Sequence, residues 1–160
     1  MATTLGSVVT LAATLALAAT ALPTNAATFV YVGCTDSNEI HILQLDPQNG
    51  DLTPVEKVTI PGIAKTAGST PMAISPDRKF LFAATRGEPM VAASFRIDSA
   101  TGKLSHVANG PLDGSMAYIA TDRSGRFLLA ASYPNNKVTL NPIAPDGTSR
   151  FTRPTGGSTW

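Results

Sequence analysis

Few side chains of this 160-residue sequence could take part in chemistry. Arg86 ends an apolar run, and an arginine can hold a carboxylate or a phosphate. Tyr118 and Tyr133 offer hydroxyl groups, and His41 and His106 are the two histidines. A hydrolysis would need a general base such as His, Glu or Asp, and a group that polarises the carbonyl oxygen. What these residues can do therefore depends on the elements that position them.

Other kinds of site are missing from the sequence. It has no metal-ligand spacing of Cys and His, no Gly-x-Ser-x-Gly turn and no glycine motif for phosphates or dinucleotides. The single cysteine, Cys34, cannot form an internal disulfide, and we expect a small residue at the end of a buried strand rather than a reactive thiol. We therefore expect neither a metal nor a cofactor. The net charge of +1, from 12 Lys and Arg against 11 Asp and Glu, excludes a basic surface for nucleic acid.

An internal repeat indicates which secondary-structure elements position these residues. Phe29, Phe80 and Phe127 each lie at the start of a short apolar run, and they are 51 and 47 residues apart. An acidic turn precedes the second and third runs, at Asp77 and Asp122. A period near fifty residues is typical of propeller blades or solenoid units.

A second repeated pattern marks tight turns. Gly50 and Gly102 lie 52 residues apart in the matching segments 45–53 and 97–105, and Gly147 ends a looser third copy. Glycine at such steps supplies the positive φ that turns between antiparallel strands require. With 13 Gly and 12 Pro spread between short apolar runs, the sequence indicates an all-β protein.

The middle unit is predicted to contain four strands, near Pro71–Ser75, Phe80–Thr85, Val91–Ile97 and Lys103–Ala108. Four antiparallel strands per unit is the pattern of a β-propeller blade. A small β-sandwich is the alternative, although its strands do not usually repeat at this spacing. We therefore predict an all-β fold, a β-propeller of four-stranded antiparallel blades, of which this chain holds about two to three.

In a propeller, functional groups converge on the central channel. Arg86 is expected at the end of a second strand, Tyr133 at the equivalent place in the next blade, and Tyr118 on an inner strand. Each has a structural alternative: Arg86 could pair with Glu88 or a neighbouring blade, Tyr133 could pack over the turn that follows it, and Tyr118 could pack between blades. Both histidines lie in alternating segments expected as outer strands, far from the axis.

The first 26 residues resemble a secretory signal. No charged side chain occurs from Met1 to Thr35, Leu5–Leu22 is apolar, and small residues follow Pro23, with Ala27 as a candidate mature start. The segment has no Lys or Arg at its start, so a membrane anchor and a cytoplasmic location are alternatives. We expect a periplasmic or secreted protein with no stable membrane span after signal removal.

Several motifs in a fixed order carry a family resemblance. Phe29–Gly33, Ser75–Leu81, Arg86–Pro89, Gly102–Leu104 and Asp122–Phe127 resemble the amino-terminal part of the propeller-type lactonase family. That family includes the bacterial 6-phosphogluconolactonases and is related to the fungal carboxy-muconate lactonising enzymes. The resemblance implies seven blades in the complete ring. Residues 27–150 would then form a partial propeller, and residues 151–160 a polar, disordered tail.

The resemblance implies a hydrolase that takes a small-molecule sugar lactone such as 6-phosphogluconolactone. Its substrate-binding candidates here are Arg86, Tyr118 and Tyr133, whereas the catalytic residues are unknown and would lie in later blades. The signal-like segment favours an unphosphorylated lactone instead. Two alternatives are a non-enzymatic propeller that binds a ligand and an inert gene fragment. Open blade edges also predict self-association.

Overall fold

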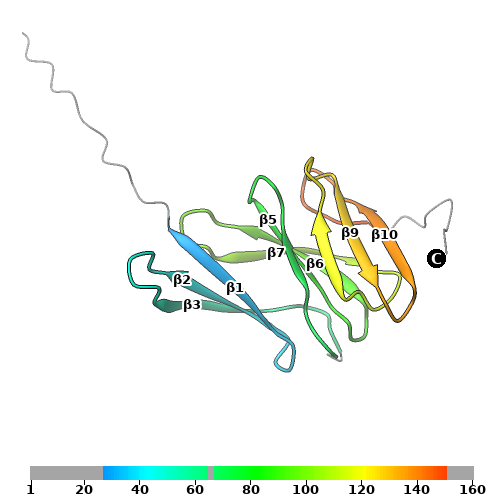
Figure 1. Ribbon diagram of the computed structural model, residues 1–160, viewed down its shortest axis with the longest axis horizontal. Coiled ribbons are helices and arrows are strands. Elements are labelled where there is room, and N and C mark those ends of the chain that lie inside the picture. The colour runs from blue at the N-terminus through cyan, green and yellow to red at the C-terminus, as the bar shows by residue number, and fades with distance from the viewer. Residues whose placement is uncertain (1–26, 65–66, 151–160) are drawn as a thin grey trace, which may run out of the picture.

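The computed structural model describes residues 27–64 and 67–150, which form ten strands and, within these ranges, no helix. The strands make three antiparallel sheets that follow one another along the molecule in chain order (Figure 1). Sheet 1 contains β1 (Thr28–Cys34), β2 (Glu39–Leu45) and β3 (Leu52–Thr59). Sheet 2 contains β4 (Met72–Ile74), β5 (Phe80–Ala84), β6 (Val91–Ile97) and β7 (Leu104–Pro111). Sheet 3 contains β8 (Tyr118–Thr121), β9 (Phe127–Ser132) and β10 (Lys137–Pro142).

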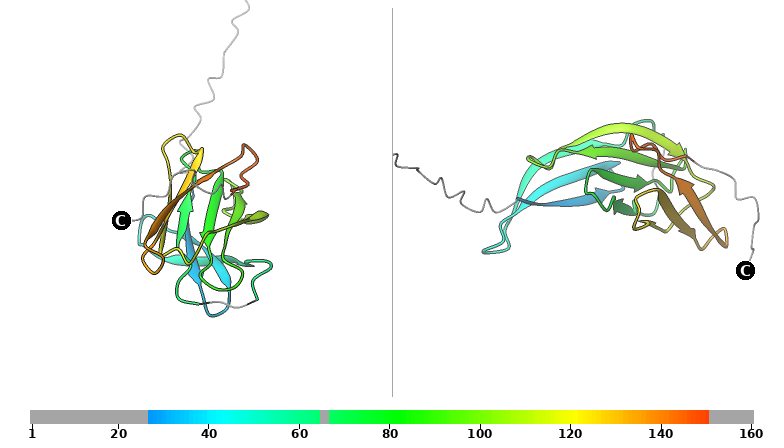
Figure 2. Two further views of the ribbon diagram at one scale, coloured as in Figure 1. Left: turned by 90° about the vertical axis from the view of Figure 1, so that its right-hand side faces the viewer. Right: turned by 90° about the horizontal axis from the view of Figure 1, so that it is seen from above.

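The prediction of an all-β chain with a four-stranded middle unit is confirmed. The order β4-β5-β6-β7 is that of a propeller blade, with a shorter inner strand and a longer outer strand than expected. The view from above in Figure 2 shows the sheets in succession, with β1 and β10 toward opposite ends of the described chain. This serial packing differs from the two facing sheets of a β-sandwich.

The repeated phenylalanines occupy equivalent strands. Phe29 lies in β1, Phe80 begins β5 and Phe127 begins β9. Both β5 and β9 have an inner neighbour, β4 and β8, whereas β1 has none among the described residues. Sheet 2 alone has both an inner and an outer edge strand; within 67–150, sheet 3 has no counterpart of β7. Sheet 1 therefore lacks an inner strand, and sheet 3 an outer one, in the described part of the chain.

Two hydrophobic clusters join the three sheets. All five residues of β5 are buried, because alternate side chains point to opposite faces of sheet 2. One face packs against sheet 1 in a cluster of Ile40, Ile42, Ile60, Leu81, Ala83, Ala93, Phe95 and Leu104. The other packs against sheet 3 in a cluster of Phe80, Phe82, Ala84, Ala92, Leu112, Met116, Ile119, Leu128 and Ala130.

A turn glycine of each later sheet packs on the repeated phenylalanine of the sheet before it. A Cβ atom on Gly102 would overlap the ring of Phe29, and one on Gly147 would overlap the ring of Phe80. The hydroxyl of Tyr31 also donates a hydrogen bond to the carbonyl oxygen of Gly102, at 2.8 Å. The repeated phenylalanine and the repeated turn glycine are thus the two partners of one contact. This contact occurs between sheets 1 and 2 and again between sheets 2 and 3.

The acidic turns are closed by their aspartates. Asp122 accepts hydrogen bonds from the backbone N–H groups of Arg126 and Phe127, both at 2.9 Å. The Ser124 hydroxyl lowers the pKa of Asp122 most, and these amides lower it further. Asp77 accepts a hydrogen bond of 2.6 Å from the Ser75 hydroxyl, which is the main reason that its pKa is also lowered.

Two expectations need correction or restriction. His41 lies on β2, the central strand of sheet 1, rather than on an outer strand, because β3 pairs with its far side. His106 does lie on an outer strand, β7. Cys34 ends β1 as expected, but it is only partly buried.

The signal-like segment 1–26 and the tail 151–160 lie outside the described residues and stay predictions. None of the described residues forms a helix with the length and apolar character that crossing a membrane requires.

Candidate functional site

Arg86 and Tyr133 come together between sheets 2 and 3. Arg86 follows β5 and Tyr133 follows β9, each six residues after its repeated phenylalanine. Nη2 of Arg86 donates a hydrogen bond of 3.2 Å to the hydroxyl of Tyr133, and the guanidinium carbon lies 5.5 Å from the centre of that ring. The repeat therefore brings the same position of two neighbouring sheets into direct contact.

Two serines complete the surroundings of the guanidinium. Nε of Arg86 donates to the hydroxyl of Ser115 at 3.0 Å, and Nη1 donates to the hydroxyl of Ser69 at 3.4 Å. Ser69 precedes β4 and Ser115 precedes β8, so both stand in loops that lead into inner strands. We call Arg86, Tyr133, Ser69 and Ser115 the arginine cluster. The sequence did not reveal the two serines, because no motif surrounds them.

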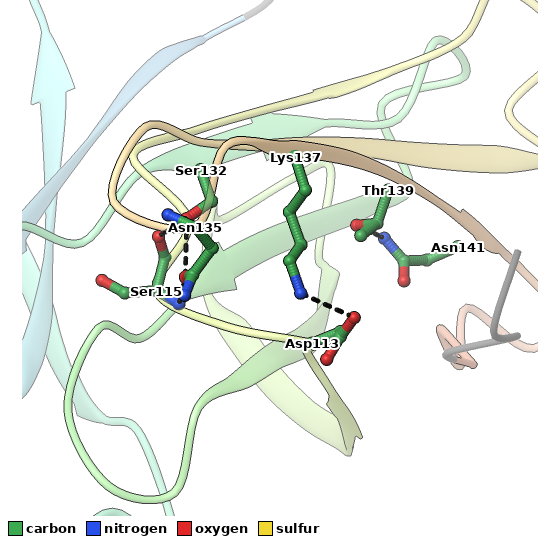
Figure 3. Close-up of polar contacts among 7 residues, drawn as sticks. All are labelled: Asp113, Ser115, Ser132, Asn135, Lys137, Thr139 and Asn141. Carbon is green, nitrogen blue, oxygen red and sulfur yellow. Dashed lines mark hydrogen bonds and ion pairs between the residues drawn. The ribbon is translucent and has the colours of Figure 1, made fainter. Parts of the chain in front are cut away.

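The loop that carries Ser115 is fixed by the β9–β10 turn (Figure 3). Oδ1 of Asn135 accepts a hydrogen bond of 3.2 Å from the backbone N–H of Ser115. The hydroxyl of Ser132 lies 2.7 Å from the carbonyl oxygen of Ser115 and 2.8 Å from the same Asn135 oxygen. Lys137 forms an ion pair of 2.9 Å with Asp113. These contacts hold the Ser115 loop where its hydroxyl meets Arg86.

A contact between two uncharged side chains occupies the equivalent place between sheets 1 and 2. Thr35 also lies six residues after its phenylalanine, and its hydroxyl is 3.1 Å from that of Thr70, beside Ser69. Thr35 is a position that an alignment of the three repeats would have found. Among the three equivalent positions, Arg86 is the charged one.

Tyr118 lies at the start of the inner strand β8, as expected, but it makes no hydrogen bond to the arginine cluster among the described residues. It pairs with Ala131 across the sheet, and 66% of it is exposed. Since the cluster Met116, Ile119, Leu128 and Ala130 belongs to the other face of sheet 3, Tyr118 points away from sheet 2.

The hydrogen-bond partners of the Arg86 guanidinium among the described residues are neutral hydroxyls. The ion pairs of the described residues are His41 with Glu39, Lys79 with Asp77 and Lys137 with Asp113, so the expected alternative of pairing with Glu88 is not what the structure shows. An arginine has five N–H donors, and the three bonds to hydroxyls leave one on each of Nη1 and Nη2. A guanidinium with a donor left on each terminal nitrogen can form hydrogen bonds with the oxygens of a carboxylate or phosphate.

No general base accompanies Arg86 among the described residues. The hydrogen bonds of His41 go to Glu39 and those of His106 to Asn109, at 3.1 and 2.9 Å. The same part of the chain has no group of His, Cys, Asp and Glu that could hold a metal ion. The cluster as described can therefore bind an anion, but it cannot by itself activate a water.

The arginine cluster lies apart from a groove on the described part of the chain. A groove of about 830 Å³ is lined by residues that include Phe29, Tyr31, Ile74 and Arg78, near the Phe80 end of β5, whereas Arg86 follows the other end. The groove lies along β1, the edge at which sheet 1 lacks an inner strand in the described chain. We attribute the groove to this open edge and place the candidate site at the cluster.

Comparisons with known proteins agree with this fold. Residues 29–154 match the pattern of the family described as "Lactonase, 7-bladed beta-propeller". The chain belongs to this lactonase family. A 6-phosphogluconolactonase of Pectobacterium atrosepticum is 40% identical over 118 residues, which cover 74% of this chain and 33% of that protein. One from Yersinia pestis (strain Pestoides F) matches with the same identity and coverage. The chain thus spans about a third of the length of these relatives.

Solved structures of similar fold extend the comparison. The periplasmic gluconolactonase of Pseudomonas aeruginosa superposes with a TM-score of 0.68 at 22% identity, covering 78% of this chain and 35% of that one. A protein from Lactobacillus plantarum gives a TM-score of 0.69 at 21% identity, covering 78% and 37%. At these identities, the structural similarity supports the propeller fold of this chain and no statement about its substrate or activity.

Proposed function

We propose that this chain supplies the first blades of a propeller that binds and hydrolyses a sugar lactone, with Arg86 as the anion-binding residue. The observation that carries the proposal is that, among the residues 27–64 and 67–150, the Arg86 guanidinium donates three hydrogen bonds to hydroxyls and keeps one further donor on each of Nη1 and Nη2. Its relatives named 6-phosphogluconolactonase suggest the substrate class, a lactone with an acidic group.

Each member of the cluster has a part in this proposal. Arg86 would hold the phosphate of the substrate or the carboxylate of the product. Tyr133 and Ser115 would keep its guanidinium in one orientation, which lowers the cost of ordering it on binding. We propose Tyr118 as a weaker contact, because it lies on the inner strand but outside the cluster.

Hydrolysis adds water to the lactone carbonyl carbon, breaks the ring C–O bond and gives the ring oxygen a proton. The base for that water and the donor for the carbonyl oxygen are proposed to come from later blades, since no His, Asp or Glu of the described chain forms a hydrogen bond with Arg86. The catalytic residues therefore remain unassigned, and we propose no metal or cofactor.

A propeller that binds a sugar acid without hydrolysing it is the second candidate function. The absence of a His, Asp or Glu from the hydrogen-bond partners of Arg86 in the described chain favours it. The signal-like segment also leads us to propose a periplasmic or secreted location, where an unphosphorylated lactone would replace the phosphorylated one.

The test is a calorimetric titration of the chain with 6-phosphogluconate and with gluconate, beside assays of lactone hydrolysis against the spontaneous rate. We expect binding that Arg86→Gln weakens at least about tenfold, since a charge-assisted pair contributes about 1.5–3 kcal/mol. Arg123→Gln is the matched control, because Arg123 is exposed in the β8–β9 turn at the other end of sheet 3.

The outcomes separate the candidates. In a protein that includes the later blades, binding with hydrolysis above the spontaneous rate supports the lactonase, and binding without hydrolysis supports the sugar-acid receptor. A preference for gluconate supports the exported, unphosphorylated version. If neither acid binds, or if Arg86→Gln and Arg123→Gln behave alike, the anion site at Arg86 is wrong.

A further inference from the structure

The contact between sheets 2 and 3 contains two buried oxygens without a hydrogen-bond partner in the described chain. They are Oγ of Ser94 on β6 and Oδ1 of Asn141 on β10, and the two residues are 0% and 1% exposed. Leaving a buried polar atom unpaired costs free energy, so each such atom in a folded protein requires an explanation.

Both side chains point into the same space. Ser94 pairs with Phe82 across sheet 2, and Asn141 pairs with Leu128 across sheet 3. Directly paired residues project from the same face of a sheet. Since Phe82 and Leu128 belong to the one hydrophobic cluster between sheets 2 and 3, Ser94 and Asn141 also face this contact. A further sheet stacked on the opposite face of sheet 3 would not reach either oxygen.

The orientation of the Asn141 amide follows from its other partners. Nδ2 donates a hydrogen bond of 3.0 Å to the carbonyl oxygen of Leu128 and one of 3.1 Å to Oγ1 of Thr139. A carbonyl oxygen can only accept, so the NH₂ group must lie on this side of the amide. Oδ1 therefore points the other way. The Thr139 hydroxyl accepts from Nδ2 and keeps its own hydrogen to donate.

The equivalent place between sheets 1 and 2 is apolar. Ile42 and Ser94 each pair with the residue two positions after the repeated phenylalanine, and Phe95 and Asn141 each pair with the residue one position after it. Ile42 and Phe95 both belong to the cluster that joins sheets 1 and 2. The same two positions thus hold large apolar side chains in one contact and shorter polar side chains in the next, which leaves more space between sheets 2 and 3.

We propose that a water molecule is bound between sheets 2 and 3, where it donates a hydrogen bond to Oδ1 of Asn141 and forms a second one with Oγ of Ser94. The Thr139 hydroxyl is available as a third partner, and a buried water typically makes about three hydrogen bonds. Lys137, Thr139 and Asn141 project from one side of β10 (Figure 3), so polar groups extend from the partly exposed ion pair of Lys137 with Asp113 to the buried site. This inference does not depend on the proposed anion site.

The water site makes the stacking of the sheets specific. The side of sheet 1 that packs on sheet 2 presents Ile40 and Ile42, which offer no polar group. Against that side, Oδ1 of Asn141 would be buried without a partner, at a cost in free energy. The site therefore favours sheet 3 beside sheet 2 over sheet 3 beside sheet 1.

Magnetic relaxation dispersion of water tests the proposal, because it counts the water molecules that stay bound for longer than the protein takes to tumble. The double variant Ser94→Ile/Asn141→Phe introduces the pair of side chains that sheets 1 and 2 have, and it should hold one long-lived water fewer than the wild type. Thr85→Val is the matched control. Thr85 is also buried in sheet 2, but its hydroxyl donates to the carbonyl oxygen of Pro89 and accepts from the N–H of Val91, both at 3.0 Å, so its loss should leave the count unchanged.

Urea unfolding and a crystal structure give two further measurements. Ser94→Ile alone and Asn141→Phe alone each leave the other polar atom buried without a partner, so the double variant should have a urea midpoint closer to the wild type than either single variant. A crystal structure of the wild type should show an ordered water within hydrogen-bond distance of both oxygens, and it decides the question if a variant does not fold. An unchanged water count in the double variant, additive losses in the urea midpoint, or a crystal structure in which the two side chains bond directly to each other would overturn the proposal.

Discussion

The replacement of Gly102 by alanine tests whether the glycine–phenylalanine contact holds the sheets together. Gly102 has φ of 70°, a conformation that costs an L-residue roughly 1–2 kcal/mol. The new Cβ atom would also overlap the Phe29 ring, and forced overpacking of this kind costs typically about 1–3 kcal/mol. If the ring moves and the Tyr31 hydroxyl loses its bond to Gly102, about 0.5–1.5 kcal/mol is lost as well. We expect Gly102→Ala to lower the free energy of unfolding by about 3–5 kcal/mol.

Gly50→Ala is the control that isolates the contact. Gly50 occupies the equivalent turn with φ of 82°, but nothing lies within 4 Å of its added Cβ atom. Its replacement should therefore cost only the backbone term, roughly 1–2 kcal/mol. Urea unfolding followed by circular dichroism gives both values, at protein concentrations low enough to keep the chain monomeric.

If Gly102→Ala and Gly50→Ala lower the free energy of unfolding equally, the contact with Phe29 does not stabilise the fold. A double-mutant cycle with Phe29→Val adds a second condition, because a smaller side chain makes room for the methyl group. The cost of Gly102→Ala should then fall by at least about 1 kcal/mol. An unchanged cost would mean that the backbone conformation, and not the ring of Phe29, makes the residue necessary.

Two further predictions concern the acidic turns and the arginine cluster. The pKa values of Asp77 and Asp122 are lowered in the folded protein, so the unfolded chain binds more protons at low pH. The stability that the two carboxylates contribute is present above the ordinary aspartate pKa of 3.8, and it is lost as the pH falls through their pKa values in the folded protein. Urea midpoints measured from about pH 5 to about pH 3 should fall less steeply for Asp122→Asn than for the wild type, and equal slopes would contradict the assignment. Asn135→Ala removes the acceptor for the Ser115 backbone N–H and should weaken 6-phosphogluconate binding about two- to tenfold, the value of one hydrogen bond. A calorimetric titration measures this, and unchanged affinity would show that the Ser115 loop does not position Arg86.

The sequence predicted the elements that the repeat determines. Phe29, Phe80 and Phe127 marked equivalent strands, and the acidic turns marked where two of them begin. Hydrophobic runs and turn residues are local signals, so they fix strand positions to within a few residues. The repeat also placed Arg86 and Tyr133 at equivalent positions, six residues after their phenylalanines, but it did not predict the hydrogen bond between them.

Features that depend on neighbours of a strand were not predictable in this way. His41 has the alternating environment of an edge strand, yet β3 pairs beside it and makes β2 central. The direction of Tyr118 depends on strand register, because a shift of one residue turns a side chain to the other face. Ser69 and Ser115 lie in irregular loops, where no periodicity indicates which hydroxyl reaches the guanidinium.

The proposed anion site has the same origin as the packing of the sheets. Stacking one sheet on the next brings the residue six positions after each phenylalanine toward the loop that leads into the next inner strand, as the contacts of Thr35 with Thr70 and of Arg86 with Ser115 show. The fold thus fixes where a functional side chain stands, and the residue type at that position sets its chemistry. In the described chain these positions hold a threonine, an arginine and a tyrosine, which can bind an anion but supply no base. The base that the proposed hydrolysis requires would therefore have to come from a sheet other than these three.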